Sequence, residues 1–592
     1  MKKLISALSV ALLFSFLPSI SSTFASDSLN KPQGPQTILT GLGDESFSPP
    51  APPGLADYQG YYHNDLEGLT RFGSGLLNFG VDANGKVTSV ASCTSLSDAA
   101  CSTPGQKQYH AVLPYCADNS QSDCISEVTA TSSSGTKLDV KVLGTVNSDN
   151  KQDYVGDPVQ GLPTGSEPTL VEIPGAPHAG GDLYLVKPFM EGESHDNQWV
   201  VNSFVMSIYA VKIIKGNFGF NVYQTDPSRY NHINVSGGAV LPDYSQPSGC
   251  AATSFSQCAA MYPLPLDISF GLSVRITRPI VGWLHGRVTQ PTISLSNDSN
   301  GTEVITVSAK AIKTPTVAVW KKNSELPDAV KGYYTNHGTW DNTYEGGILS
   351  PTPPNSPFSQ IAILRNSNNQ HNDKTLNEFV LWSPLLGDKA QAMPTVWAVE
   401  TMSNGVTNSP VANCINQTNS LAGLVTTNAA EYLDGPPIFA NGTLDYKVAA
   451  THFEPDGTTP FQGTYDLLMS SKVARCIYGF TNAPIKSSIS VTNDAGGASV
   501  ASTVINESNG WLTLGAYGFT YSNPTISVKL SQDAPASVIA PTPSASATPT
   551  AAPAAQVPAP AAKKITITCV KGKTTKSVTA LKPTCPSGFK KK

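Results

Sequence analysis

Ten cysteines constrain the fold of this 592-residue chain more than any other feature. Six of them form three pairs with the same C-x7-C spacing, and each pair encloses a segment of mostly polar or small residues. Repeated local spacings of this kind are typical of disulfides that close surface loops in exported proteins. We therefore predict five disulfides between nearest neighbours in the sequence: Cys93–Cys101, Cys116–Cys124, Cys250–Cys258, Cys414–Cys476 and Cys569–Cys585.

A metal site is the competing explanation for the cysteines. None of the spacings is C-x2-C or C-x4-C, and no histidine lies at ligand spacing from them. Structural zinc sites use such spacings. We expect no bound metal and no cofactor.

The first 25 residues have the pattern of a secretory signal. Lys2 and Lys3 precede an apolar run from Leu4 to Leu17, and small residues follow before Ser26. No later apolar run approaches the roughly 18 residues that a membrane-spanning helix needs. We expect an exported chain without a transmembrane span.

Composition and patterning predict an all-β protein. Charged residues make up 14% of the chain, whereas about 25% is usual. Short β-branched runs alternate with Gly, Asn and Pro, which favours several β-sandwich-like domains stapled by disulfides. The expected divisions are a signal peptide (1–25), an extended arm (26–54), an N-terminal β-region (55–168), a central β-domain (169–325), a C-terminal β-domain (326–533), a Pro/Ala linker (534–562) and a basic Cys module (563–592).

The stretch Val274–Leu295 is the best candidate for a binding site. It contains three of the chain's seven arginines and a Gly-bounded G-W-L-H-G segment, which suggests two strands that meet at an exposed bend. Guanidinium groups suit anions and indole rings stack on sugars, so a shelf for an anionic or sugar ligand is one interpretation. The alternative is a structural corner in which these side chains only pack. The candidate binding residues are Arg275, Arg278, Trp283, His285 and Arg287.

The segment Met190–Asn197, M-E-G-E-S-H-D-N, is the most enzyme-like part of the sequence. Glu191 and Glu193 could face one side as a carboxylate pair, as glycosidases require, with His195 nearby. Exposed acidic loops are usually only solvated. No G-x-S-x-G, H-E-x-x-H, P-loop or G-x-G-x-x-G motif accompanies the segment. A hydrolase or lyase acting on polysaccharide is therefore the alternative function.

Three further segments suggest strands. G-Y-Y-T-N-H at Gly332 echoes G-Y-Y-H-N at Gly60, which suggests a duplicated domain or a Tyr-rich edge strand. S-K-V-A-R-C-I-Y-G-F from Ser471 and W-L-T-L-G-A-Y-G-F from Trp511 alternate as buried strands do.

The C-terminal end combines a spacer with a basic module. Residues 534–562 contain seven prolines and twelve alanines, the composition of an extended linker. Residues 563–592 contain nine lysines and no acidic residue, which gives this segment a formal charge of +9 and leaves −14 for the rest of the chain. Such a module suggests attachment to an anionic cell-wall polymer or glycan, although a merely solubilising tail is the alternative. The predicted anchor residues are Lys571, Lys573, Lys576, Lys590, Lys591 and Lys592.

The tail also resembles a known kind of module. Cys569, Lys571–Lys576, Pro583–Pro586 and Gly588–Lys592 are similar to a short Cys/Lys/Pro module at the C-termini of otherwise unrelated secreted proteins of Gram-positive bacteria. The segments A-R-C-I-Y-G-F and G-W-L-H-G-R resemble those of large exported β-proteins that carry the same tail. The resemblance implies export and a shared envelope destination, and it transfers no catalytic residue.

Together these features predict a non-catalytic protein of the cell envelope or extracellular space with a binding, adhesive or structural role. The acidic body and the export signal exclude a nucleic-acid partner from this expectation.

Overall fold

The computed structural model of the chain describes residues 39, 41–47, 49, 58–66, 73–146, 153–195, 198–218, 249–254, 256–299, 301–322, 324–337, 363–367, 373–402, 413–415, 420–433, 436–482, 485–492, 502–521, 525–532, 565–571, 574–580, 585 and 589–591. The predicted signal (1–25) and linker (534–562) lie outside these residues, as does most of the arm (26–54). The chain forms two compact units, Met1–Ala534 and Pro535–Lys592.

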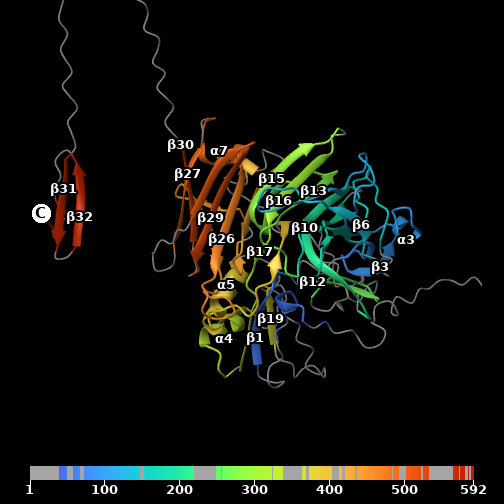
Figure 1. Cartoon of the computed structure of the whole chain (residues 1–592), viewed down its shortest axis with the longest axis horizontal. Helices are drawn as coiled ribbons and strands as arrows, with labels where there is room; N and C mark the ends of the chain where they lie inside the picture. The colour runs from blue at the N-terminus through green and yellow to red at the C-terminus, as the bar shows by residue number, and fades with distance from the viewer. Residues whose placement is uncertain are drawn as a thin grey trace, which may run out of the picture. The chain divides into compact units, whose positions relative to one another are not determined.

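The larger unit is mostly β-structure, which confirms the predicted fold class (Figure 1). Its largest sheet has sixteen strands within the described residues. These strands are β2 (Gly75–Val81), β3 (Val87–Cys93), β4 (Gln106–Val112), β6 (Lys141–Thr145), β7 (Thr169–Glu172), β8 (Leu183–Val186), β9 (Phe189–His195), β10 (Gln198–Lys215), β11 (Cys250–Ser254), β12 (Gln257–Tyr262), β14 (Gly282–Arg287), β21 (Ala398–Thr401), β22 (Leu421–Thr427), β26 (Gln462–Ser470), β28 (Ser502–Ser508) and β29 (Trp511–Thr520).

Smaller sheets complete the larger unit. They are β18 (Val317–Lys322), β1 (Tyr58–His63) and β19 (Ile363–Ser367); β15 (Thr289–Asn297), β16 (Glu303–Lys310), β13 (Ser269–Ile276) and β5 (Cys124–Thr131); β17 (Ile312–Lys313) and β20 (Thr395–Val396); and β23 (Glu431–Tyr432), β24 (Ile438–Ala440), β25 (Thr443–Ala449), β30 (Thr525–Gln532) and β27 (Ile485–Thr492). The short helices are η1 (Gly43–Ser46), α3 (Ala99–Ser102), α4 (Asp328–His337), α5 (Asp373–Trp382), η3 (Ser383–Leu385) and α7 (Ser471–Tyr478).

The middle strands of the large sheet are buried on both faces, so two hydrophobic cores share them. Along β22, Leu424 belongs to the core that includes the β13 and β16 side chains, whereas the next residue, Val425, belongs to the core that includes β25 and β30. Leu467 and Leu468 on β26 divide in the same way. Successive strand residues point to opposite faces, so a strand between two cores has to be apolar at nearly every position. All seven residues of β22 are indeed buried.

The large sheet draws its strands from all three of the predicted β-regions. β4 comes from the first region, β14 from the second and β26 from the third, and all three lie in one hydrogen-bonded order. Figure 1 shows the early strands toward one end of this unit and the late strands toward the other.

The prediction of strands was wrong for two segments. Gly332–His337 lies in helix α4, so the echo of Gly60 does not mark a repeated strand. Ser471–Tyr478 forms helix α7, whose buried residues Val473 and Ala474 follow a helical rather than an alternating pattern. Gly479, with φ of 63°, ends α7 in the left-handed conformation that glycine adopts without strain. Trp511–Thr520 forms strand β29 as predicted.

Four of the predicted disulfides are confirmed. They join Cys93 to Cys101, Cys116 to Cys124, Cys250 to Cys258 and Cys414 to Cys476. Cys585 is also disulfide-bonded, and the side chain of Cys569 lies outside the described residues.

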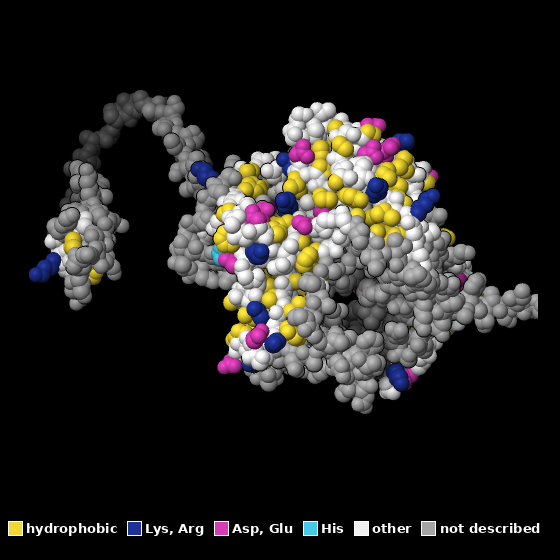
Figure 2. Space-filling view, turned by 60° about the horizontal axis from the view of Figure 1, so that its bottom comes forward, with side chains coloured by type: hydrophobic (Ala, Val, Ile, Leu, Met, Phe, Trp, Pro, Cys, Tyr) yellow, Lys and Arg dark blue, Asp and Glu magenta, His cyan; other side chains and the backbone are white. Residues whose placement is uncertain are grey.

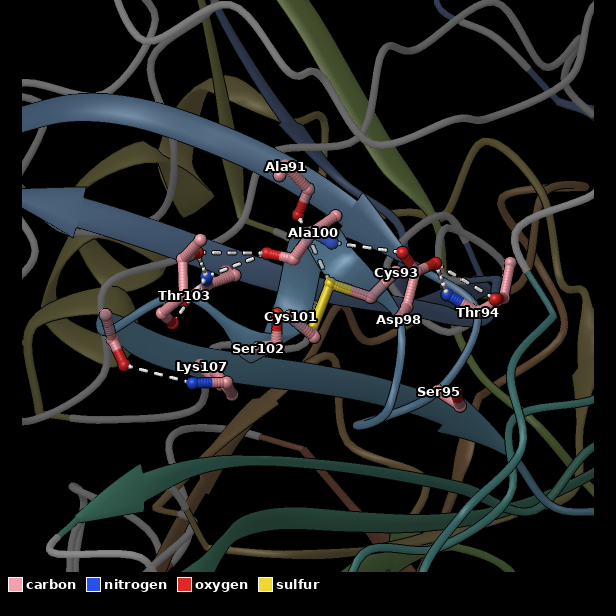
Figure 3. Close-up of a disulfide and its surroundings, with 12 residues drawn as sticks. Ala91, Cys93, Thr94, Ser95, Asp98, Ala100, Cys101, Ser102, Thr103 and Lys107 are labelled. Carbon is pink, nitrogen blue, oxygen red and sulfur yellow. Dashed lines mark hydrogen bonds between the residues drawn. A yellow bond between two sulfur atoms is a disulfide. The ribbon is translucent and has the colours of Figure 1, made fainter.

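The loop around Cys93–Cys101 illustrates how such a staple is supported (Figure 3). Asp98 accepts hydrogen bonds from the backbone N–H groups of Ala100 and Thr94, both at 3.0 Å, and so caps the short helix α3. Several disulfides of this kind indicate an oxidising, extracytoplasmic environment.

We predict that Gly423→Ala destabilises the larger unit. A Cβ atom at position 423 would lie 2.2 Å from the Trp283 ring and 2.6 Å from the Leu468 carbonyl oxygen, and such overpacking costs about 1–3 kcal/mol. Urea unfolding measures the loss. Gly332→Ala is the matched control: its Cβ would meet no atom within 4 Å, so stability should be unchanged or slightly higher. Equal effects of the two changes would contradict the prediction.

Candidate functional site

The G-W-L-H-G segment within Val274–Leu295 does not form an exposed bend. The whole stretch supplies the end of β13, the whole of β14 and most of β15, and G-W-L-H-G-R is itself strand β14. β14 lies inside the large sheet, antiparallel to β21 and parallel to β22. The prediction of two strands meeting at this segment is therefore wrong, because a strand between two cores can be apolar and glycine-rich without turning.

The glycines of this strand allow close packing. A Cβ atom on Gly286 would lie 2.5 Å from the carbonyl oxygen of Ala398 on the neighbouring strand. Trp283 is 4% exposed, and its ring lies over Gly423. The Trp283 indole thus occupies the space that a side chain at position 423 would otherwise fill.

Arg287 is the centre of a buried polar network. Its side chain is 3% exposed, and its Nε lies 2.8 Å from Asp65 Oδ2. The guanidinium carbon lies 4.5 Å from the centroid of the Tyr432 ring, within the range of a cation–π contact. The remaining donors reach three backbone carbonyl oxygens, that of Thr427 at the end of β22 and those of Ala429 and Ala430 just after it.

His63 adds a second buried cation to this network. Its Nδ1 lies 3.0 Å from Glu431 Oε1 and its Nε2 lies 3.4 Å from Asp65 Oδ1, and its side chain is fully buried. Burial by itself lowers the pKa of His63, but Glu431 and Asp65 outweigh it and raise this pKa to about 9. Two cations, His63 and Arg287, therefore face two carboxylates at neutral pH.

His285 is also held inside the protein. Its Nδ1 lies 2.6 Å from the Tyr432 hydroxyl and its Nε2 lies 3.9 Å from Glu400 Oε1. Both ring nitrogens thus face partners of the same chain. Trp283, His285 and Arg287 lie on one face of β14, as their alternation requires, and that face is interior.

The other two arginines of the stretch hold surface loops. Arg275 Nε lies 3.5 Å from Asp298 Oδ2, and its guanidinium donates to the Asp118 carbonyl oxygen and to Asn119 Oδ1 within the Cys116–Cys124 loop. Arg278 donates to the Gln160 carbonyl oxygen at 3.2 Å. The structure does not bring the five candidate binding residues together on one surface.

The acidic segment forms a strand rather than a loop. Glu191 and Glu193 lie on β9, two positions apart, so they face the same side at a separation of about 7 Å. The Glu191 side chain is 34% exposed, whereas Glu193 is 2% exposed. Burial and the charge of Glu193 raise the pKa of Glu191. The side chain of His195 lies outside the described residues.

Strand β4 brings two polar residues to this pair that sequence reasoning missed. His110 lies opposite Glu191 in the register, with its Nδ1 4.0 Å from Glu191 Oε2. Gln106 Nε2 donates to Glu193 Oε2 at 2.9 Å. Burial lowers the pKa of His110 to about 3, so its imidazole is neutral. The alternating polar residues of Gln106–His110 were the available signal.

The smaller unit is a three-stranded sheet. Its strands are β31 (Ile565–Lys571), β32 (Thr574–Ala580) and β33 (Lys590–Lys591). Cys569 pairs with Lys576 on one side and with Lys591 on the other. Lys590 and Lys591 are exposed, and the anchor candidates Lys573 and Lys592 lie outside the described residues.

The sequence matches no protein-family model and no curated protein. Within the described part of the chain, no three or more His, Cys, Asp or Glu side chains gather as metal ligands would. No helix in that part has the length and apolar character needed to cross a membrane.

We predict that the network around His63 weakens as the pH rises. The folded pKa of about 9 exceeds the ordinary value of 6.5, so the folded protein binds this proton more tightly. The stabilisation is complete below pH 6.5 and is lost as the pH rises through 9, with a slope of at most about 1.4 kcal/mol per pH unit. The measurement is the free energy of unfolding of the wild type and of His63→Gln between pH 6 and 10.

The difference between these two proteins isolates His63 from other groups. Burial lowers the pKa of Lys187 to about 8, so Lys187 has the opposite effect on stability in this range and contributes equally to both proteins. His63→Gln should cost about 3–5 kcal/mol near pH 7, because it leaves two buried carboxylates with one cation, and less at pH 10. His178→Gln is the control, since burial lowers the pKa of that histidine. A His63→Gln cost that does not change with pH would contradict the assignment.

Proposed function

We propose that this chain is an exported, non-catalytic protein of the cell envelope or extracellular space. In this proposal the larger unit is a structural or binding body, and the smaller unit attaches it to an anionic surface. The disulfides, which fit an oxidising compartment, support export. The secretory pattern of residues 1–25 and the resemblance of the tail to modules of secreted Gram-positive proteins support it as well.

The observation that carries the proposal is the separation of charge between two units. Pro535–Lys592 is a compact unit of its own and holds nine lysines without an acidic residue. On the face of the larger unit shown in Figure 2, side chains of both signs are interspersed among its described residues. A separately folded unit that carries nine lysines and no acidic residue suits attachment to a negatively charged surface.

The interior of the larger unit supports a structural body. The sequence suggests ligand binding by Trp283, His285 and Arg287. In the structure, each of these side chains contacts residues of the same chain. Arg275 and Arg278 contact its loops. Such contacts position strands and loops. In this proposal, attachment to a surface is therefore the role of the lysines of the smaller unit.

We predict that removal of the smaller unit abolishes binding to cell walls. The full-length protein and a chain ending at Ala534, which is the boundary of the larger unit, are incubated with purified walls at 50 and 500 mM salt. The full-length protein should sediment with the walls at low salt and be released at high salt, because salt screens exposed charges. The shortened chain should stay in solution.

Circular dichroism of the shortened chain shows whether the larger unit remains folded. Equal sedimentation of both proteins would contradict attachment through the lysines and would point to a binding surface on the larger unit.

A second candidate function is favoured by one observation, the carboxylate pair beside His110. The Cα atoms of Glu191 and Glu193 lie about 7 Å apart along β9, and inverting glycosidases hold two carboxyl groups roughly 6.5–9.5 Å apart. Glu191, whose pKa is raised, would protonate the glycosidic oxygen, while Glu193 would take a proton from the water that attacks the anomeric carbon. This candidate would make the chain a hydrolase of polysaccharide.

If this second candidate holds, Glu191→Gln and Glu193→Gln should each lower the release of reducing ends from a polysaccharide by about 100-fold or more. Glu172→Gln is the matched control, because Glu172 pairs with Lys141 at the surface and should leave the rate unchanged. Absence of product from the wild-type protein across a panel of polysaccharides would remove the candidate.

A further inference from the structure

The chemistry of the basic charge in the smaller unit is uniform. All nine cationic side chains of Pro535–Lys592 are lysines, and none of the chain's seven arginines lies there. Arginine's planar fork recognises individual carboxylate or phosphate groups through paired hydrogen bonds, whereas a lysine ammonium acts as a compact point charge. A unit whose only cations are lysines therefore responds to the charge density of its partner more than to the shape of any one anionic group.

The strand register sets the spacing of these charges. Lys576 and Lys591 pair with Cys569 from opposite sides, which places their Cα atoms about 10 Å apart across the three strands. Lys571 lies two residues after Cys569 on the middle strand, about 7 Å along it. Lys590 precedes Lys591 on the edge strand. The Cα atoms of Lys571, Lys576 and Lys591 thus lie at intervals of about 7–10 Å in two directions, and Lys590 is directly adjacent to Lys591.

Linear polyanions differ in how strongly they bind such an array of lysines. Two unit charges in water interact with an energy of about RT at roughly 7 Å, so a polymer with closer charges holds condensed counterions. Each lysine that binds it releases a counterion, and this release drives association. A polymer with more widely spaced charges gains much less.

We propose that the smaller unit binds linear polymers of closely spaced phosphate groups, without recognising their sequence or their backbone. This inference rests on the proposed function, in which the smaller unit attaches the protein to an anionic surface, and names the class of partner. Anionic membranes are a poorer fit, because peripheral binding to lipid also uses apolar or aromatic side chains. Residues 563–592 contain a single aromatic residue, Phe589, which is partly buried.

The test measures the affinity of the full-length protein for three probes between 50 and 200 mM salt. The probes are long-chain inorganic polyphosphate, hyaluronate with one carboxylate per disaccharide, and vesicles that contain anionic phospholipid. With four lysines engaged, affinity for polyphosphate should fall about 50- to 150-fold over this salt range. Affinity for hyaluronate and for vesicles at 50 mM salt should be at least ten times weaker than for polyphosphate.

Variants separate the lysine array from net charge. Lys576→Gln/Lys590→Gln/Lys591→Gln should weaken polyphosphate binding and lower the slope of log affinity against log salt by about 2–3. The same three positions changed to arginine should retain both affinity and slope, because the charges remain. Lys86→Gln/Lys137→Gln/Lys141→Gln changes three exposed lysines of the larger unit by the same net charge and should have little effect.

Three outcomes would overturn the inference: equal affinity for hyaluronate, tighter binding to vesicles, or loss of polyphosphate binding in the arginine variant. Each is compatible with wall binding that depends on the smaller unit, so the proposed attachment would survive it. Loss of that dependence in the sedimentation assay would instead overturn the attachment itself.

Discussion

The buried guanidinium of Arg287 is the constraint on which the larger unit depends. A charge at 3% exposure is costly unless anions and hydrogen-bond acceptors surround it. Its partners come from distant parts of the chain: Asp65 follows β1, and the carbonyl oxygens it contacts lie at and just after the end of β22. The network can therefore form only when the early, middle and late segments of the larger unit have already met. Stability and the correct assembly of the sheets are coupled at this point.

Burial of both faces of the central strands explains why Trp283, His285 and Arg287 lie in the interior although their side chains could bind a ligand. β14 lies between β21 and β22 with a core on either side, so both alternating sets of its side chains are interior. Trp283 fills the space over Gly423, and His285 and Arg287 contact Tyr432. The function proposed here accordingly rests on the lysines of the smaller unit.

Features that depend on residues close together in the sequence could be predicted from the sequence. The C-x7-C spacing identified three disulfides because a nine-residue segment can close on itself without help from the rest of the fold. Helix α7 was missed because a short segment such as Val473–Tyr478 can match an alternating or a helical pattern equally well. His110 was missed beside Glu191 because a register between β4 and β9 joins residues about 80 positions apart.

The sequence by itself determined the β-rich fold class, the disulfide staples and the concentration of positive charge at the C-terminus, because composition, spacing and net charge do not depend on long-range contacts. Only the tertiary structure decided that strands from all three predicted regions share one sheet. It also decided that Arg287 and His63 face Asp65 in the interior, while Arg275 reaches the stapled loop. Alternation indicates that a strand has two faces, but it does not say what covers each of them. That depends on strands brought together from distant positions in the chain.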